Sequence, residues 1–499
     1  MFNFKSLLAN PFAKMVHYRL QKEAKNAVKD QQSILNQLIK IGQRTVFGKD
    51  HGLDKVSDYE SFKQAVPIRD YEGFKSYIEM VKKGTPNVLW KGLPIYFAKT
   101  SGTTSGVKYI PITKDSISNH INGARNAILT YMATTGNTAF AGGRMMFLSG
   151  SPELERVGGI ATGRLSGIVN HHIPAYLRKN QLPSFETNCI EEWEEKLEKV
   201  VEETLGKDMT LIGGIPPWMQ MYFDSLVAKT GKPVKDLFPN LQLLVQGGVN
   251  FEPYKTKLFE TIGKEIDTIE LFPASEGFFA FQDRRNEPGL LLNTNSGIFY
   301  EFIPLAEVHN ENPTRLSLGE VQLGAQYALI ISSNAGLWGY SIGDTVKFIS
   351  VDPYRIIVSG RVKHFISAFG EHVIGEEVEQ ALLKAATEMN VSVIEFTVAP
   401  FIAQGEGKSY HEWFIEFEKA PADLELFRQK LDTYLCEKNV YYKDLIDGKI
   451  LEPLKISALQ KNGFINYMRA QGKLGGQNKV PRLSNDRNIA VDLTHYINK

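Results

Sequence analysis

Short apolar segments alternate with segments of helical period through most of the chain. Residues 191–205 place Trp193, Leu197, Val200 and Val201 at helical spacing among charged residues, which predicts an amphipathic helix. A further helix is expected over residues 24–47. Four segments have the length and composition of strands: 144–148, 209–212, 241–245 and 266–271. This alternation predicts an α/β layer fold with much parallel sheet, in which ligands bind at the strand ends.

The pattern changes after Gly360-Arg361. Helices are expected over 376–389 and 424–436, and strands over 392–398 and 413–417. This is a compact α+β pattern, separate from the alternating region. The sequence therefore predicts a large N-terminal α/β domain over 1–360 and a smaller C-terminal domain over 361–499.

The composition is that of a large globular protein. The 499 residues are 43% hydrophobic, and the formal net charge of +1 gives no electrostatic reason to expect nucleic acid or an anionic membrane as partner. Polar residues interrupt the apolar stretches of residues 1–20, so no signal-peptide core is expected. Cys189 and Cys436 have no metal or redox spacing, which favours a cytoplasmic protein.

The run Lys-Thr-Ser-Gly-Thr-Thr-Ser-Gly-Val-Lys over residues 99–108 suits the binding of a polyphosphate. Small residues let backbone N–H groups approach, hydroxyls donate to phosphate oxygens, and Lys108 adds a positive charge. It is not a Walker loop, because Gly102 and Gly106 are too close together and Val107 separates Gly106 from Lys108. Strands are expected on both sides, over 95–98 and 109–112. The alternative is a flexible Ser/Gly hairpin tip.

Two later motifs add to this loop. Phe272-Pro273-Ala274-Ser275-Glu276 follows a predicted strand and places an aromatic residue four positions before a carboxylate. Tyr340-Ser341-Ile342-Gly343-Asp344 leads into another predicted strand. Gly339 to Gly343 also matches the G-x-S-x-G nucleophile elbow, but the strand expected after it argues for a chance match.

In this order, the three motifs resemble those of the adenylate-forming superfamily of acyl-CoA synthetases, adenylation domains and luciferases. The details resemble the Gretchen Hagen 3 (GH3, auxin-responsive promoter) family of acyl acid–amido synthetases. The resemblance covers nearly the whole chain and includes these further segments: Val66-Pro67-Ile68, Asp70-Tyr71-Glu72, Gly214-Ile215-Pro216-Pro217-Trp218, Phe299-Tyr300-Glu301-Phe302-Ile303-Pro304 and Val480-Pro481-Arg482.

The resemblance implies a site for ATP and Mg²⁺. Phe272 takes the position of the ring that stacks on adenine, Glu276 that of the Mg²⁺ ligand, and Asp344 that of the ribose-binding carboxylate. The remaining residues expected to contact the nucleotide are Thr100, Ser101, Gly102, Thr103, Thr104, Ser105, Ser275 and Tyr340. Without the resemblance, Phe272 would be interpreted as a core residue, Glu276 as a surface residue and Asp344 as a turn residue.

The resemblance also implies cationic groups near the phosphates. Arg361 and Lys363 lie at the expected hinge between the domains, and Lys479 corresponds to a lysine that a mobile C-terminal domain brings to the adenylating centre. Together with Lys108 and Glu276, Lys479 is expected to act in catalysis. The chain departs from the family in having Phe272 where Tyr is usual, and Gly339 and Ser341 where arginines are common.

The implied function is a two-step ATP-dependent ligase, which adenylates a carboxylic acid and transfers the acyl group to an amine, with an amino acid as the expected acceptor. The acid pocket is expected to include residues 158–173 and the side chains of Pro216, Trp218, Met219 and Tyr222, which alternatively pack in the core. A CoA ligase shares the first half-reaction and stays an alternative. A nucleotide-binding regulator without turnover is another. The sequence identifies neither acid nor amine, and no oligomeric state.

Overall fold

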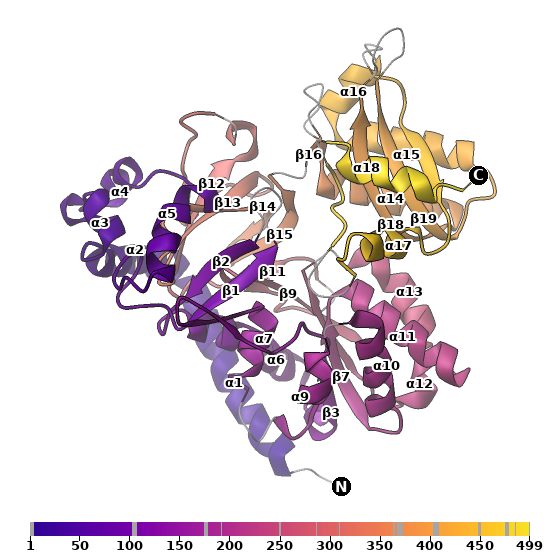
Figure 1. Ribbon diagram of the computed structural model, residues 1–499, viewed down its shortest axis with the longest axis horizontal. Coiled ribbons are helices and arrows are strands. Elements are labelled where there is room, and N and C mark those ends of the chain that lie inside the picture. The colour runs from indigo at the N-terminus through magenta and orange to yellow at the C-terminus, as the bar shows by residue number, and fades with distance from the viewer. Residues whose placement is uncertain are drawn as a thin grey trace. The chain divides into compact units, whose positions relative to one another are not determined.

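The computed structural model describes residues 4–498 apart from 102–106, 174–177, 191, 249–250, 286, 309, 363–364, 367–372, 403–408, 448–450, 475–478 and 485. Contacts divide the chain into two compact units (Figure 1). The first comprises residues 1–251, 258–342 and 346–358, and the second comprises 252–257, 343–345 and 359–499.

The first unit is organised on a mixed eleven-stranded sheet with the order β12-β13-β14-β15-β11-β10-β9-β8-β7-β3-β6. Its strands are β3 (Arg144–Phe147), β6 (Gln181–Leu182), β7 (Met209–Gly214), β8 (Leu243–Gly247), β9 (Asp267–Ala274), β10 (Gly277–Phe281), β11 (Leu290–Leu292), β12 (Ile298–Pro304), β13 (Gln326–Ser333), β14 (Tyr340–Val351) and β15 (Tyr354–Arg361). The predicted α/β class is confirmed.

The two halves of this sheet differ in strand direction. β6, β3, β7, β8 and β9 pair in parallel, and the four strands expected from the sequence are all among them. From β9 onward, β10, β11 and β15 pair antiparallel. The change occurs where only Ser275 and Glu276 join β9 to β10, because a two-residue connection permits a hairpin and no crossover.

Helices of the first unit cover this sheet. α6 packs on β9 and β10, α1 packs on α6, and α10 packs on α11 (Figure 1). The helices are α1 (Phe4–Lys25), α2 (Ala27–Gly42), α3 (Val46–Asp50), α4 (Tyr59–Ala65), α5 (Tyr71–Lys82), α6 (Ile117–Thr135), α7 (Leu165–Asn170), α9 (Phe185–Cys189), α10 (Trp193–Thr204), α11 (Pro216–Thr230), α12 (Val234–Leu237) and α13 (Glu252–Ile262), of which residues 252–257 count with the second unit. Within the described ranges, no helix has the length and apolarity needed to span a membrane.

The predicted helices form with small differences in their ends. α10 begins where the Glu192 carboxylate caps the N–H of Glu195, and its buried residues include Trp193, Leu197 and Val200, as the helical spacing predicts. The single helix expected over 24–47 is instead divided, since α1 ends at Lys25, α2 spans Ala27–Gly42 and α3 begins at Val46. The apolar face of α2 still lies in the core.

A second, four-stranded sheet has the order β2-β1-β5-β4. Its strands are β1 (Tyr96–Ser101), β2 (Val107–Ile112), β4 (Glu155–Val157) and β5 (Ile160–Gly163). β1 and β2 form the hairpin that carries the polyphosphate motif, and β5 pairs in parallel with β1.

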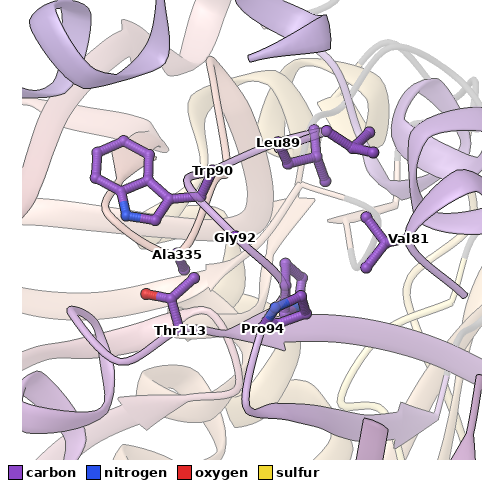
Figure 2. A pocket seen from close by; sticks show the side chains of 9 residues that line it. Val81, Leu89, Trp90, Gly92, Pro94, Thr113 and Ala335 are labelled. Carbon is purple, nitrogen blue, oxygen red and sulfur yellow. The ribbon is translucent and has the colours of Figure 1, made fainter. Parts of the chain in front are cut away.

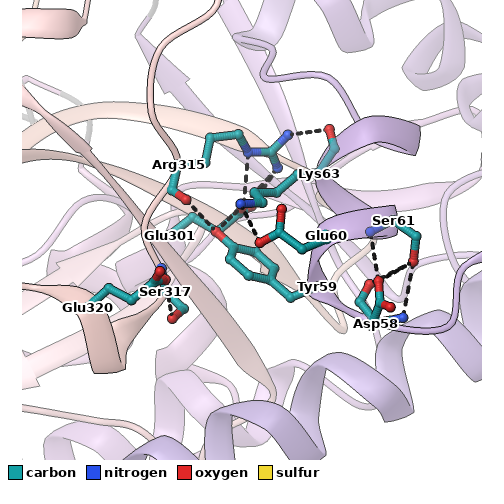
Figure 3. A network of polar contacts seen from close by, with 9 residues as sticks. All are labelled: Asp58, Tyr59, Glu60, Ser61, Lys63, Glu301, Arg315, Ser317 and Glu320. Carbon is teal, nitrogen blue, oxygen red and sulfur yellow. Dashed lines mark hydrogen bonds and ion pairs between the residues drawn. The ribbon is translucent and has the colours of Figure 1, made fainter.

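A buried ion pair ties α4 to β12 (Figure 3). Glu301 is fully buried, and both of its carboxylate oxygens accept hydrogen bonds from Arg315, from Nε at 2.9 Å and from Nη2 at 2.8 Å. Arg315 Nη1 donates to the backbone oxygens of Lys63 and Val66 at the end of α4, and the Tyr59 hydroxyl donates to Glu301 at 3.1 Å. These bonds satisfy carbonyl groups that a helix end leaves without partners.

The second unit has a three-stranded sheet with a different layer on each face. β18 (Ser392–Phe401), β19 (Tyr410–Lys419) and β20 (Lys455–Leu459) form the sheet, with β19 central. Phe396, Val398 and Trp413 pack with α14 (Gly375–Met389) and α15 (Leu424–Lys438), whereas Ala399 and Phe414 pack with α17 (Gly463–Ala470) and α18 (Asn488–Leu493). This alternation follows the two-residue period of strands.

The remaining elements of the second unit are β16 (Phe365–Ile366), β17 (Val373–Ile374) and α16 (Val440–Asp447). The predicted α+β elements are confirmed.

We expect Glu301→Gln to lower the free energy of unfolding by about 3–5 kcal/mol, because it leaves the buried Arg315 guanidinium without a compensating charge. The double variant Glu301→Leu/Arg315→Met removes both charges and should recover most of that loss. Glu320→Gln, which weakens an exposed capping contact to Ser317, is the matched control and should cost about 1 kcal/mol or less. Urea denaturation measures all three, and equal losses for Glu301→Gln and Glu320→Gln would contradict the assignment.

Candidate nucleotide and acyl-transfer site

The polyphosphate motif occupies the β1–β2 hairpin. Antiparallel pairing places Thr100 opposite Lys108 and Ser101 opposite Val107, and β2 continues to Ile112. The predicted strand–loop–strand arrangement is therefore confirmed, and no helix N-terminus follows the loop. Gly102, Thr103, Thr104 and Ser105 lie outside the described residues, as does the Ser101 side chain.

The first turn of α5 supports the base of this hairpin. The Asp70 carboxylate caps α5 by accepting from the N–H of Glu72, which places Tyr71 at the first helical position. The Tyr71 hydroxyl accepts a hydrogen bond of 3.0 Å from the N–H of Tyr109 in β2. Lys108 Nζ lies 5.9 Å from the centre of the Tyr71 ring, within the range of a cation–π contact. Tyr71 thus restrains the strand that presents Lys108.

The predicted metal ligand lies in the tight turn between β9 and β10. Glu276 is half-buried there, beside the buried Ser275. The Tyr340 hydroxyl donates a long hydrogen bond of 3.4 Å to Glu276 Oε1. Phe272 is 8% exposed, and its ring packs edge-to-face on Phe279 with 5.1 Å between ring centres. The described contacts of Phe272 are those of a core residue, and its stacking on adenine stays a prediction.

Tyr340 begins β14 and links this turn to α5. The backbone of Arg69 bonds to both sides of Tyr340, through Gly339 O at 2.9 Å and the Ser341 N–H at 2.8 Å. Gly339 has a φ of +54°, and an added Cβ would lie 2.8 Å from Pro67 O, so close approach of the two segments requires glycine. Burial and the carboxylates of Glu276 and Asp70 raise the pKa of Tyr340, which keeps the hydroxyl protonated as a donor.

The other predicted charges belong to the second unit. Arg361 Nε lies 2.8 Å from Asp344 Oδ1, and the Val362 N–H donates to Gly343 O at 2.7 Å, which holds the end of β15 beside Asp344. Arg361 is thus a cationic partner of Asp344 within the second unit. Lys479 is exposed and lies close enough to Asp344 and Arg361 for both charges to act on its ammonium group. Lys363 lies outside the described residues.

The residues predicted for the acid pocket are buried at the start of α11. Trp218 packs on Trp193 of α10 with 4.9 Å between ring centres. Met219 and Tyr222 are fully buried, and the Tyr222 hydroxyl donates to Thr204 Oγ1 at 2.7 Å. Pro216 begins α11 directly after β7. Their described contacts are packing contacts, and their role in binding an acid stays a prediction.

Two cavities differ strongly in size. One of about 240 Å³ lies beside β6 and α9, and its lining includes Pro152, Asn170, His171, Arg178 and Ser184. It overlaps the segment 158–173 expected to bind the acid. The other, of about 10 Å³, is lined mainly by apolar groups such as Val81, Leu89 and Pro94 and holds at most one water (Figure 2).

The described residues contain no cluster of three or more His, Cys, Asp or Glu side chains suited to a metal. A Mg²⁺ ion bound with a nucleotide needs only one or two protein carboxylates, because phosphates and water complete its six oxygen ligands. Glu276 alone in the β9–β10 turn fits that requirement.

Two site features went beyond the sequence analysis. Tyr71 belongs to the segment Asp70-Tyr71-Glu72, which the sequence analysis named only for its resemblance to the family. Its hydrogen bond to Tyr109 of β2 was not expected. Asp70 offered a signal, since an aspartate before an amphipathic stretch is a typical helix N-cap. The ion pair between Asp344 and Arg361 had no sequence signal, because the pairing of β14 with β15 brings them together.

Comparisons with known proteins identify the family and the fold. The GH3 family N-terminal, central and C-terminal domains match residues 16–187, 291–361 and 376–488. The indole-3-acetic acid-amido synthetase GH3.3 of Arabidopsis thaliana is 20% identical, over 91% of this chain and 88% of that protein. The structure of the AtGH3.15 acyl acid amido synthetase in complex with 2,4-DB has a TM-score of 0.80 at 15% identity, covering 98% of this chain and 96% of that one.

A structure of 2-hydroxyisobutyryl-CoA ligase in the postadenylation state, in complex with 2-HIB-AMP, has a TM-score of 0.58 at 13% identity, covering 97% of this chain and 91% of that one. The fold is therefore shared with adenylate-forming ligases and agrees better with the acyl acid amido synthetase. Three domain matches in the order of the family span most of the sequence. The chain belongs to the GH3 family.

Proposed function

We propose that this protein is an ATP-dependent ligase that adenylates a carboxylic acid and transfers the acyl group to the amine of an amino acid, releasing pyrophosphate and AMP. The observation that carries this proposal is the convergence of three distant segments in the first unit. The β1–β2 hairpin with Lys108, the β9–β10 turn with Glu276 and the start of β14 with Tyr340 are linked through Asp70 and Tyr71.

In the first half-reaction, a carboxylate oxygen of the acid attacks the α-phosphorus of ATP, and the bond to pyrophosphate breaks. The hairpin N–H groups and Lys108 hold the departing phosphates. Glu276 would hold Mg²⁺, which when bound neutralises phosphate charge. Tyr340 orients the Glu276 carboxylate through its hydroxyl.

In the second half-reaction, the nitrogen of the neutral amine attacks the carbonyl carbon of the acyl-adenylate, the carbon–oxygen bond to AMP breaks, and the nitrogen loses a proton to give the amide. Adenylation is required because a free carboxylate is a poor electrophile. Two residues of the second unit act on the nucleotide. Asp344 binds the ribose hydroxyls. Lys479 acts in the first half-reaction, where it offsets negative charge at the α-phosphate. A second unit that moves as a lid, with its hinge near residues 361–363, allows one site to serve both steps.

The acceptor is proposed to be an amine rather than the thiol of CoA. The higher structural similarity to the acyl acid amido synthetase supports this choice. We propose only that the acid is a small carboxylic acid. The two GH3 relatives described above differ in their acids, since one is named for indole-3-acetic acid and the other is in complex with 2,4-DB. The cavity of about 240 Å³ beside residues 158–173 is the candidate space for one of the two small substrates.

We expect a matching acid to drive pyrophosphate release from ATP and Mg²⁺ in the absence of any amine, because the acyl-adenylate forms before the acceptor is needed. A pyrophosphate-coupled assay over a panel of aryl and aliphatic acids measures this. AMP and amide are then followed by mass spectrometry after addition of amino acids. Thioester formation with CoA in place of amide would favour a CoA ligase. ATP binding without acid-dependent pyrophosphate release would favour a regulator, and turnover of GTP alone would refute the nucleotide assignment.

Glu276→Gln removes one charge at nearly constant shape, and we expect it to slow Mg²⁺-dependent adenylation by roughly hundredfold or more. The fold should be retained, as judged by circular dichroism and thermal unfolding. Glu287→Gln is the matched control, since Glu287 is an exposed glutamate after β10 that pairs with Arg284. Near-normal adenylation by Glu276→Gln would contradict the assignment of Glu276 as the Mg²⁺ ligand.

A further inference from the structure

The segment over residues 479–484 carries Lys479 and runs alongside β18 in the second unit. The N–H of Val398 donates to Arg482 O at 2.9 Å, and the N–H of Ser484 donates to Val398 O at 3.0 Å. The Thr397 hydroxyl donates to Pro481 O at 2.6 Å. The backbone of this segment is therefore held on β18 just after Lys479.

Arg482 anchors the segment through its side chain, which is 13% exposed. Its Nε lies 3.2 Å from Glu379 of α14, and its Nη1 bonds the Glu395 carboxylate of β18. The guanidinium lies over the Phe396 ring, 4.7 Å from its centre. Its Nη2 donates to the Tyr254 hydroxyl, which also belongs to the second unit.

This arrangement requires arginine. A guanidinium presents several N–H donors in a fixed plane, so it can bind two carboxylates and stack on a ring at once, whereas an ammonium cannot. Removing it would leave Glu379 and Glu395 close together without the positive charge between them. Lys479 stands three residues before this anchor, so its Cα stays within about 11 Å of the Arg482 Cα.

We propose that Arg482 is a positioning residue for adenylation, which fixes the segment that presents Lys479 and acts on the reaction only through that lysine. The inference rests on the proposed function of Lys479. Because Lys479 is proposed to act at the α-phosphate, Arg482 matters for the first half-reaction and little for the attack of the amine.

The test is a double-mutant cycle on Lys479→Ala and Arg482→Gln. Single-turnover pyrophosphate release reports the first step, and amide formation from synthetic acyl-adenylate reports the second. Each single variant should slow pyrophosphate release tenfold or more while changing amide formation less than about threefold. In the Lys479→Ala background, Arg482→Gln should cause no further loss, because residues that act as one unit are not additive. Arg482→Lys should restore only part of the rate.

Arg487→Gln is the matched control. Arg487 is also in the second unit, donates to Glu412 at 2.6 Å and lies over the Phe401 ring at 5.1 Å, but it follows the 479–484 segment. Losing it should lower stability to a similar degree and leave pyrophosphate release nearly unchanged. Equal slowing by Arg487→Gln, or additive losses for Lys479→Ala and Arg482→Gln, would overturn the inference.

Hydrogen exchange tests the anchor without any activity. Arg482→Gln should speed exchange at the Val398 and Ser484 amides, which bond across the segment, and Arg487→Gln should not. Unchanged exchange at both amides in Arg482→Gln overturns the anchor. If the wild-type protein releases no pyrophosphate with any acid although exchange responds as expected, the proposed function fails while the anchor stands.

Discussion

The ion pair between Glu301 and Arg315 determines where the chain leaves α4. Arg315 binds the Glu301 carboxylate and the last carbonyls of the helix, so the residues after Val66 start from one place beside β12. They then run along Gly339 and Tyr340 before Asp70 caps α5. The ion pair therefore lies where the segment that leads to Tyr71 begins. A buried pair of this kind adds little net stability, because its desolvation offsets much of its attraction, but removing one partner leaves an uncompensated buried charge.

The residues proposed for the nucleotide belong to different compact units. The hairpin, Glu276 and Tyr340 belong to the first, whereas Asp344, Arg361 and Lys479 belong to the second. β14 contributes to both sets, because Tyr340 and Asp344 both lie on this strand. Within the second unit, Lys479 lies near Asp344 and Arg361, on a segment held by β18.

Much of the fold could be predicted because hydrophobic spacing reports local structure. α10, α14, α15 and the parallel strands β3, β7, β8 and β9 form where their periodicity indicates. The division of the first predicted helix between α1 and α2 was missed, since both parts keep an apolar face and the spacing shows no interruption. The antiparallel half of the large sheet was also missed, because strand order depends on partners far apart in the chain. The residue types of the nucleotide motifs and their order were evident, but their contacts were not.

The sequence by itself determined the fold class, the hairpin strands around the polyphosphate motif and the membership in a family. The first two follow from local periodicity and from residue types that suit phosphate binding, and the third follows from the resemblance of the ordered motifs to those of the family. Only the tertiary structure decided that Tyr71 supports the hairpin, that Tyr340 meets Glu276, that Arg361 compensates Asp344 and that Arg482 anchors the segment of Lys479. Each of these contacts joins residues from separate elements. Their energies depend on distance and burial, which the order of residues along the chain does not specify.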